Sequence, residues 1–170
     1  MGMVLPSSFG PHVQSLVRAP LPELGPGVPL EAARKNLKSL TIETLFTGHA
    51  VHDEDMARCC ISALLLHNNF LDESHVISQE IETVEGSYWH GIMHRREPDA
   101  GNAKYWFRRV GPHPVLDEMK KTQGYTSPFD FIDFCERVRG SGSKDEQVAR
   151  QIQFLEWTLL FDHCWKQATK

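Results

Sequence analysis

Apolar residues recur at helical spacing over most of this chain. Between Leu30 and Gln167 they return every three to four residues, and no stretch alternates apolar and polar residues for long enough to form a β-strand. No unit of roughly 20–50 residues repeats, which argues against a solenoid. The pattern therefore predicts an all-α fold, with one helical domain of five to seven helices over residues 30–170.

The expected helices can be placed by their apolar stripes and by the residues that suit helix ends. Ser87 is expected to cap a helix that begins after a break at residues 85–87, and Asn102 is expected to cap a shorter one. Ser127 followed by Pro128 is a typical start of a helix. The last helix is the longest and is expected to be central. The predicted ranges are about 31–45, 53–68, 72–84, 87–97, 102–110, 130–138 and 144–167.

The first 29 residues differ from the rest of the chain in their proline content. Six of the ten prolines lie there, together with Gly10, Gly25 and Gly27. Because proline fixes φ and removes a backbone donor, residues 1–29 are predicted to be an extended arm without a regular element. Such an arm could wrap the helical domain, or it could contact a protein partner or a second copy of the chain.

Composition excludes several classes of protein. The net charge of the 170 residues is −4, so nothing in the overall charge indicates nucleic-acid binding. The longest nearly apolar run, Ile61–Leu66, is far shorter than the roughly 20 residues of a membrane helix. The N-terminus has neither a basic start nor an apolar segment, so no signal peptide is expected. Four cysteines without a disulfide framework favour the reducing cytoplasm.

Aromatic and basic residues concentrate in the segment 88–109. It holds five of the sixteen aromatic residues and five cations, whereas residues 72–85 carry five acids and no Lys or Arg. Neighbouring helices could simply pair these charges. Arginine next to aromatic rings also suits anionic or flat ligands, which makes the segment a candidate ligand site. The predicted ligand-binding residues are Trp89, Arg95, Arg96, Asn102, Lys104, Tyr105, Trp106 and Arg109.

Five of the histidines also cluster, between His67 and His113. His90 and His94 are four residues apart, so both imidazoles lie on one face of a helix within reach of one metal ion. Glu97 lies on the same face, and a remote histidine could complete the site. If the protein is an enzyme, His90 and His94 are its predicted catalytic acid or base, because imidazole titrates near neutral pH.

The stretch from Leu71 to Pro114, LDESHVISQEIETVEGSYWHGIMHRREPDAGNAKYWFRRVGPHP, resembles the signature block of an uncharacterised family of bacterial and fungal proteins. The block covers about a quarter of the chain, and the resemblance implies no activity, cofactor or catalytic residue.

Three functions therefore stay open on the residues alone. The first is a helical domain that binds, or turns over, a small anionic or aromatic ligand at the His/Arg/aromatic segment. The second is a helical bundle that holds a divalent metal through His90, His94 and Glu97. The third is a non-catalytic module that binds a protein partner, since interfaces also favour Arg, Tyr and Trp.

Overall fold

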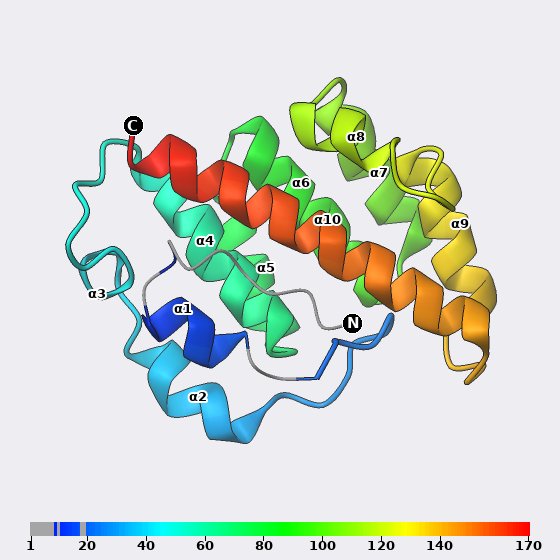
Figure 1. Cartoon of the computed structure of the whole chain (residues 1–170), viewed down its shortest axis with the longest axis horizontal. Helices are drawn as coiled ribbons and strands as arrows, with labels where there is room; N and C mark the ends of the chain where they lie inside the picture. The colour runs from blue at the N-terminus through cyan, green and yellow to red at the C-terminus, as the bar shows by residue number, and fades with distance from the viewer. Residues whose placement is uncertain (1–8, 10, 18–19) are drawn as a thin grey trace.

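The computed structural model of the chain describes residues 9, 11–17 and 20–170. These residues form helices and no β-strand, so the predicted all-α fold is confirmed (Figure 1). The helices are α1 (Pro11–Leu16), α2 (Glu31–Lys38), α3 (Ile42–Leu45), α4 (Glu54–His67), α5 (Leu71–Ser78), α6 (Val84–Arg96), α7 (Ala100–Val110), α8 (Pro114–Met119), α9 (Pro128–Val138) and α10 (Lys144–Ala168).

The C-terminal helix α10 is the longest, as the sequence predicts, and it runs across the whole molecule (Figure 1). It packs against α4, α8 and α9. Aromatic side chains one turn apart line its buried face, and the rings of Trp157 and Phe161 stack with centroids 5.0 Å apart. This apolar face of α10 is the centre of the core.

Helix α6 is the element that positions the histidines. It contacts α4, α5 and α7, so side chains all around it are buried, including Tyr88, Trp89 and Ile92. A helix surrounded in this way has no single apolar stripe, because every face meets another helix. Gly91 lets α7 approach closely: a Cβ there would lie 3.0 Å from the ring of Phe107.

Two predicted N-terminal caps are wrong by three or four residues. Helix α6 begins at the cap Thr83, whose side chain accepts a hydrogen bond from Gly86 N, and Ser87 lies inside the helix. The glycine that suggested a break is needed there, because a Cβ on Gly86 would overlap the carbonyl oxygen of Ile81. Helix α7 is capped by Asp99 rather than by Asn102, since the carboxylate accepts from the backbone N–H of residue 102. The predicted cap Ser127 is confirmed.

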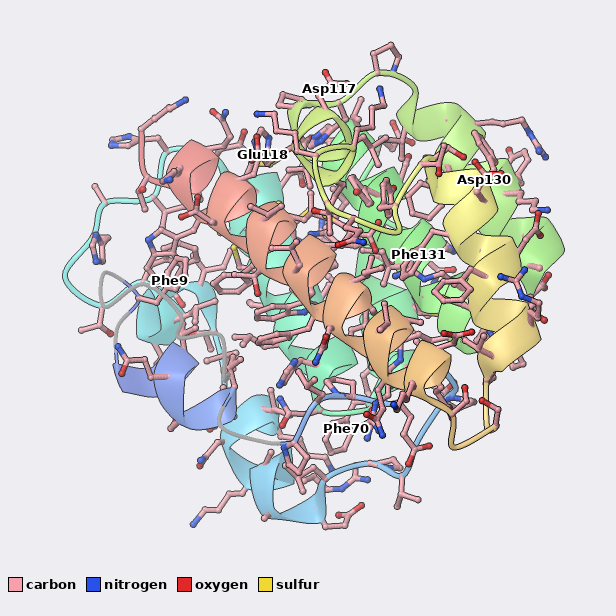
Figure 2. All side chains as sticks on the ribbon, turned by 45° about the vertical axis from the view of Figure 1, so that its right-hand side comes forward. Phe9, Phe70, Asp117, Glu118, Asp130 and Phe131 are labelled. Atoms are coloured by element: carbon pink, nitrogen blue, oxygen red, sulfur yellow. The ribbon has the colours of Figure 1, made fainter. Side chains whose placement is uncertain are left out.

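The structure corrects the prediction that residues 1–29 contain no regular element. Helix α1 lies within them, and it begins at a proline, which is tolerated at the first helical position because that N–H needs no partner. Among its described residues, Phe9, Val13, Leu16, Val17 and Leu24 are buried in the core, whereas Val28 is exposed. Phe9, labelled in Figure 2, packs edge-on against Phe161 and Trp165. Val13 and Leu24 are 0% exposed.

The described residues contain ten helices, against the five to seven expected. Helices α1, α3 and α8 have only four to six residues each, too few for an apolar period to be recognised. The capping residue Thr41 also divides the first expected helix into α2 and α3. Among the described residues, none of these helices has both the length and the hydropathy needed to cross a membrane.

Candidate functional site

Three histidines meet where α5 packs against α6. His90 and His94 lie one turn apart on α6, and His75 reaches them from the last turn of α5. The ring centroid of His75 is 4.7 Å from that of His90 and 5.2 Å from that of His94. One nitrogen of each residue lies within 4.8 Å of one nitrogen of each of the other two. We call these three residues the histidine cluster.

The surroundings of the histidine cluster fix the orientation of two of its rings. The ring of His90 stacks on Trp106 of α7 at 4.0 Å, with an angle of 16° between the planes. The Nδ1 atom of His94 lies 2.8 Å from a carboxylate oxygen of Glu97. A carboxylate only accepts hydrogen bonds, so Nδ1 carries the proton and the lone pair of the neutral ring is on Nε2.

Burial keeps the centre of the cluster uncharged. His90 is 3% exposed, and its Nδ1 has no hydrogen-bond partner among the described residues. Loss of hydration, together with the neighbouring rings of His94 and His75, lowers the pKa of His90 to about 3. His90 is therefore neutral at physiological pH, and a neutral imidazole is the form that binds metal ions.

The geometry of the cluster suits a tetrahedral metal ion. Zinc binds imidazole nitrogens at about 2.0–2.1 Å, which places two such ligands about 3.3 Å apart. The nitrogens of the cluster lie within 4.8 Å of one another, so side-chain rotations that bring them together by about 1.5 Å or less would complete the ligand set. A carboxylate behind a ligand histidine is common in metal sites, because it fixes the tautomer and raises the basicity of the ring. Glu97 has this position behind His94.

The sequence predicts part of this set. His90 and His94 come together as their spacing requires. Glu97 lies against His94, and the third nitrogen of the cluster comes from His75. His75 was only one of several remote histidines in the sequence, and no spacing rule joins it to His90, because its position depends on how α5 packs against α6.

A second group of similar composition lies near the other end of α6. His163 of α10 has its Nε2 atom 3.0 Å from Glu85, and His113, which precedes α8, has its Nε2 atom 3.5 Å from the same oxygen. We call these residues the Glu85 group. The neighbouring rings of His113 and then His163 hold the pKa of Glu85 well below its usual range.

The hydrogen bonds of the Glu85 group make it a poor metal site. The Nδ1 atom of His113 accepts a hydrogen bond from Val115 N as the cap of α8, so the proton of the neutral ring is on Nε2. The Nε2 atom of His163 also faces a carboxylate and donates to it. In both rings the nitrogen that faces the group lacks the lone pair that a metal needs.

The structure places two of the predicted ligand-binding arginines inside the fold. Arg95 is fully buried, and its Nη2 donates to the buried carboxylate of Glu156 at 2.6 Å. Arg96 is 2% exposed and donates to backbone carbonyls and to Asn69. It lines a small cavity of about 10 Å³ with His67, and neither His90 nor His94 is among the residues that line this cavity. In this structure both guanidiniums therefore donate to groups of the chain itself.

The other predicted ligand-binding residues are spread over several environments. Trp89 is 0% exposed in the core, Asn102 donates to Asp99, and Lys104 pairs with Asp133 at 2.5 Å. Tyr105 is exposed on α7. Only Trp106 touches the histidine cluster, and its ring also lies 5.1 Å from the guanidinium carbon of Arg109.

Comparisons of the chain with protein-family models, with curated proteins and with solved structures find no match. The resemblance of residues 71–114 to an uncharacterised family therefore stays a prediction.

Proposed function

We propose that this chain is a metal-binding helical protein that holds one divalent transition-metal ion at the histidine cluster. The observation that carries the proposal is the convergence of His75, His90 and His94, with a carboxylate behind one of them. Three imidazoles favour zinc and the neighbouring first-row metals over magnesium or calcium, which prefer oxygen ligands. Glu97, predicted as a ligand, acts in this proposal by orienting His94.

A small ligand would bind at the metal in this proposal. Three protein ligands leave one position of a tetrahedral ion for water or for a small anion, and a metal-bound water is a nucleophile near neutral pH. His75 is only half-buried, which supports access from solvent on the α5 side. Trp106 and Arg109 form the nearest aromatic and basic surface, so they remain the best candidates for contacting a bound ligand.

We propose the reducing cytoplasm as the compartment of this protein. The four free, buried cysteines support this proposal, because disulfides form and persist in oxidising compartments.

The test is the metal content of the full chain purified without a histidine tag. We expect about one equivalent of zinc, or of another first-row metal, after purification or after loading and desalting. The variants His90→Ala and His94→Ala should each retain less than a tenth of that metal.

The Glu85 group supplies the matched control. The variant His163→Ala also removes one histidine from a cluster of three possible metal ligands. In that cluster the ring nitrogens that face the carboxylate carry protons, so the variant should keep the full metal content. Absence of metal from the loaded parent protein, or equal metal in parent and His90→Ala, would overturn the proposal.

A further inference from the structure

Six consecutive carbonyl groups of the N-terminal arm accept hydrogen bonds from side chains of the helical bundle. The carbonyls of Leu21 and Pro22 accept from Arg150, and that of Glu23 accepts from Gln153. The carbonyl of Leu24 accepts from Arg139 at 3.3 Å. The carbonyls of Gly25 and Pro26 accept from Arg96 at 3.1 and 3.4 Å. We call the four side chains, Arg96, Arg139, Arg150 and Gln153, the donor surface.

The donor surface is assembled from three helices that are distant in sequence. Arg96 ends α6, Arg139 follows the last residue of α9, and Arg150 and Gln153 lie one turn apart on α10. Figure 1 shows the blue segment that follows α1 lying beside the orange part of α10. The segment itself has no helix or strand.

The chemistry of the two partners is complementary. Pro20, Pro22 and Pro26 have no backbone N–H, so a segment rich in proline offers mainly carbonyl acceptors. Guanidinium groups only donate, and here they donate to main-chain oxygens. Such contacts do not depend on the side chains of the segment, because every residue carries a main-chain carbonyl.

One side chain of the segment gives the contact its register. Leu24 is 0% exposed, whereas Glu23 and Pro26 on either side are exposed. Pro22 covers the cavity of about 10 Å³ beside Trp157. Leu24 is therefore the side chain that anchors this segment in the bundle.

The carbonyls of the segment take the place of water as hydrogen-bond partners of the Arg96 guanidinium. This guanidinium is buried, and its hydrogen-bond partners are the carbonyls of Gly25, Pro26 and Leu66 and the side chain of Asn69. Loss of hydration lowers its pKa to about 9, the neighbouring Arg95 adds to this effect, and the acid Glu23 of the arm opposes it. Without the segment, the donors of this surface would need water or another peptide.

We propose that the donor surface is a peptide-binding site for a proline-rich segment of a partner protein, and that residues 21–26 occupy it in cis. The partner segment has a leucine flanked by prolines, and an acid beside the leucine suits the three arginines. The arm competes with it at the high local concentration of a tethered ligand. This site is independent of the histidine cluster.

The test uses the full chain and a fluorescent peptide with the sequence of residues 20–29, PLPELGPGVP. Leu24→Asp should release the arm by placing a charge in the core. Gly27→Val should release it separately, because φ is +67° there and a Cβ would lie 2.8 Å from the side chain of Asn69. By fluorescence anisotropy, each folded variant should bind the peptide at least tenfold more tightly than the parent chain does.

Two controls connect binding to the donor surface. Adding Arg139→Met and Arg150→Met to the released variant should weaken peptide binding at least tenfold. Arg137→Met, a change on α9 where the guanidinium lies over Phe134, should leave it unchanged. The proposal is overturned if released variants with native circular dichroism bind the peptide no better than the parent. It is also overturned if they bind no peptide but form dimers by arm exchange, because a second copy is then the occupant.

Discussion

Replacement of Arg95 by methionine should be among the most destabilising single changes in this protein. Its guanidinium lies 2.6 Å from Glu156, both side chains are 0% exposed, and the guanidinium carbon is 4.6 Å from the ring centre of Phe131. Methionine keeps an unbranched apolar stem but leaves the carboxylate with Tyr88 as its remaining hydrogen-bond donor among the described residues. An uncompensated buried charge costs about 3–5 kcal/mol.

The measurement is urea unfolding of parent and variant, followed by circular dichroism at neutral pH. A loss of that size is a large part of the roughly 5–15 kcal/mol by which a typical domain is stable, and it corresponds to roughly 10 °C in Tm for a chain of this length. The double variant Arg95→Met/Glu156→Met should recover most of the loss, because it removes both charges. A single variant within about 1 kcal/mol of the parent, or a double variant less stable than the single one, would refute the structural role of Arg95.

Three further predictions concern buried polar groups and one close contact. Burial, with the nearby charge of Arg96, lowers the pKa of His67 to about 4, so the unfolded chain takes up its proton first and the folded state loses stability as the pH falls from 6.5 towards 4, by up to about 3 kcal/mol. His67→Leu should remove that part of the pH dependence in urea unfolding at pH 7 and pH 4, and an unchanged slope would contradict the assignment. The lowered pKa of Glu85 gives stability that is complete above about pH 4.5 and is lost below it, so Glu85→Gln should reduce the Tm at pH 7 and leave it nearly unchanged at the lowest pH at which the chain still folds. Gly86→Ala should reduce the Tm although alanine favours helices, because its Cβ would overlap the carbonyl oxygen of Ile81, and a raised Tm would show that α6 can shift.

The fold could be predicted from the sequence as far as it depends on local pattern. Long helices such as α4 and α10 have several turns of apolar spacing, and their ranges differ from the predicted ones by a residue or two. Helix α8 was missed because its six residues fill less than two turns and its cap is a histidine. The burial of the arm was missed because proline content describes its backbone, whereas Phe9 and Leu24 determine where it packs.

The candidate site was predictable only within one helix. His90 and His94 share a face by their spacing, but His75 joins them through the packing of α5 on α6. Arg95 looked like a ligand-binding residue because its partner Glu156 lies 61 positions away in the sequence. A ligand site and a buried ion pair can both consist of a cation beside aromatic residues. The sequence therefore does not distinguish them, and the fold does.

The donor surface could not be predicted from the sequence, because its acceptors are main-chain atoms. Its acceptors are main-chain carbonyls of residues 21–26, which every residue type carries. The arginines that meet them are scattered over residues 96–150, and no spacing rule relates them to the arm.

X-ray absorption at the zinc edge of the zinc-loaded full chain tests the metal site most directly. The histidine cluster predicts three imidazole nitrogens at about 2.0–2.1 Å and one further light ligand from water or an anion. His90→Ala should lose this spectrum, and His163→Ala should keep it. Sulfur at about 2.3 Å, or two or fewer imidazoles in the parent protein, would show that the metal binds elsewhere and would contradict a site formed by His75, His90 and His94.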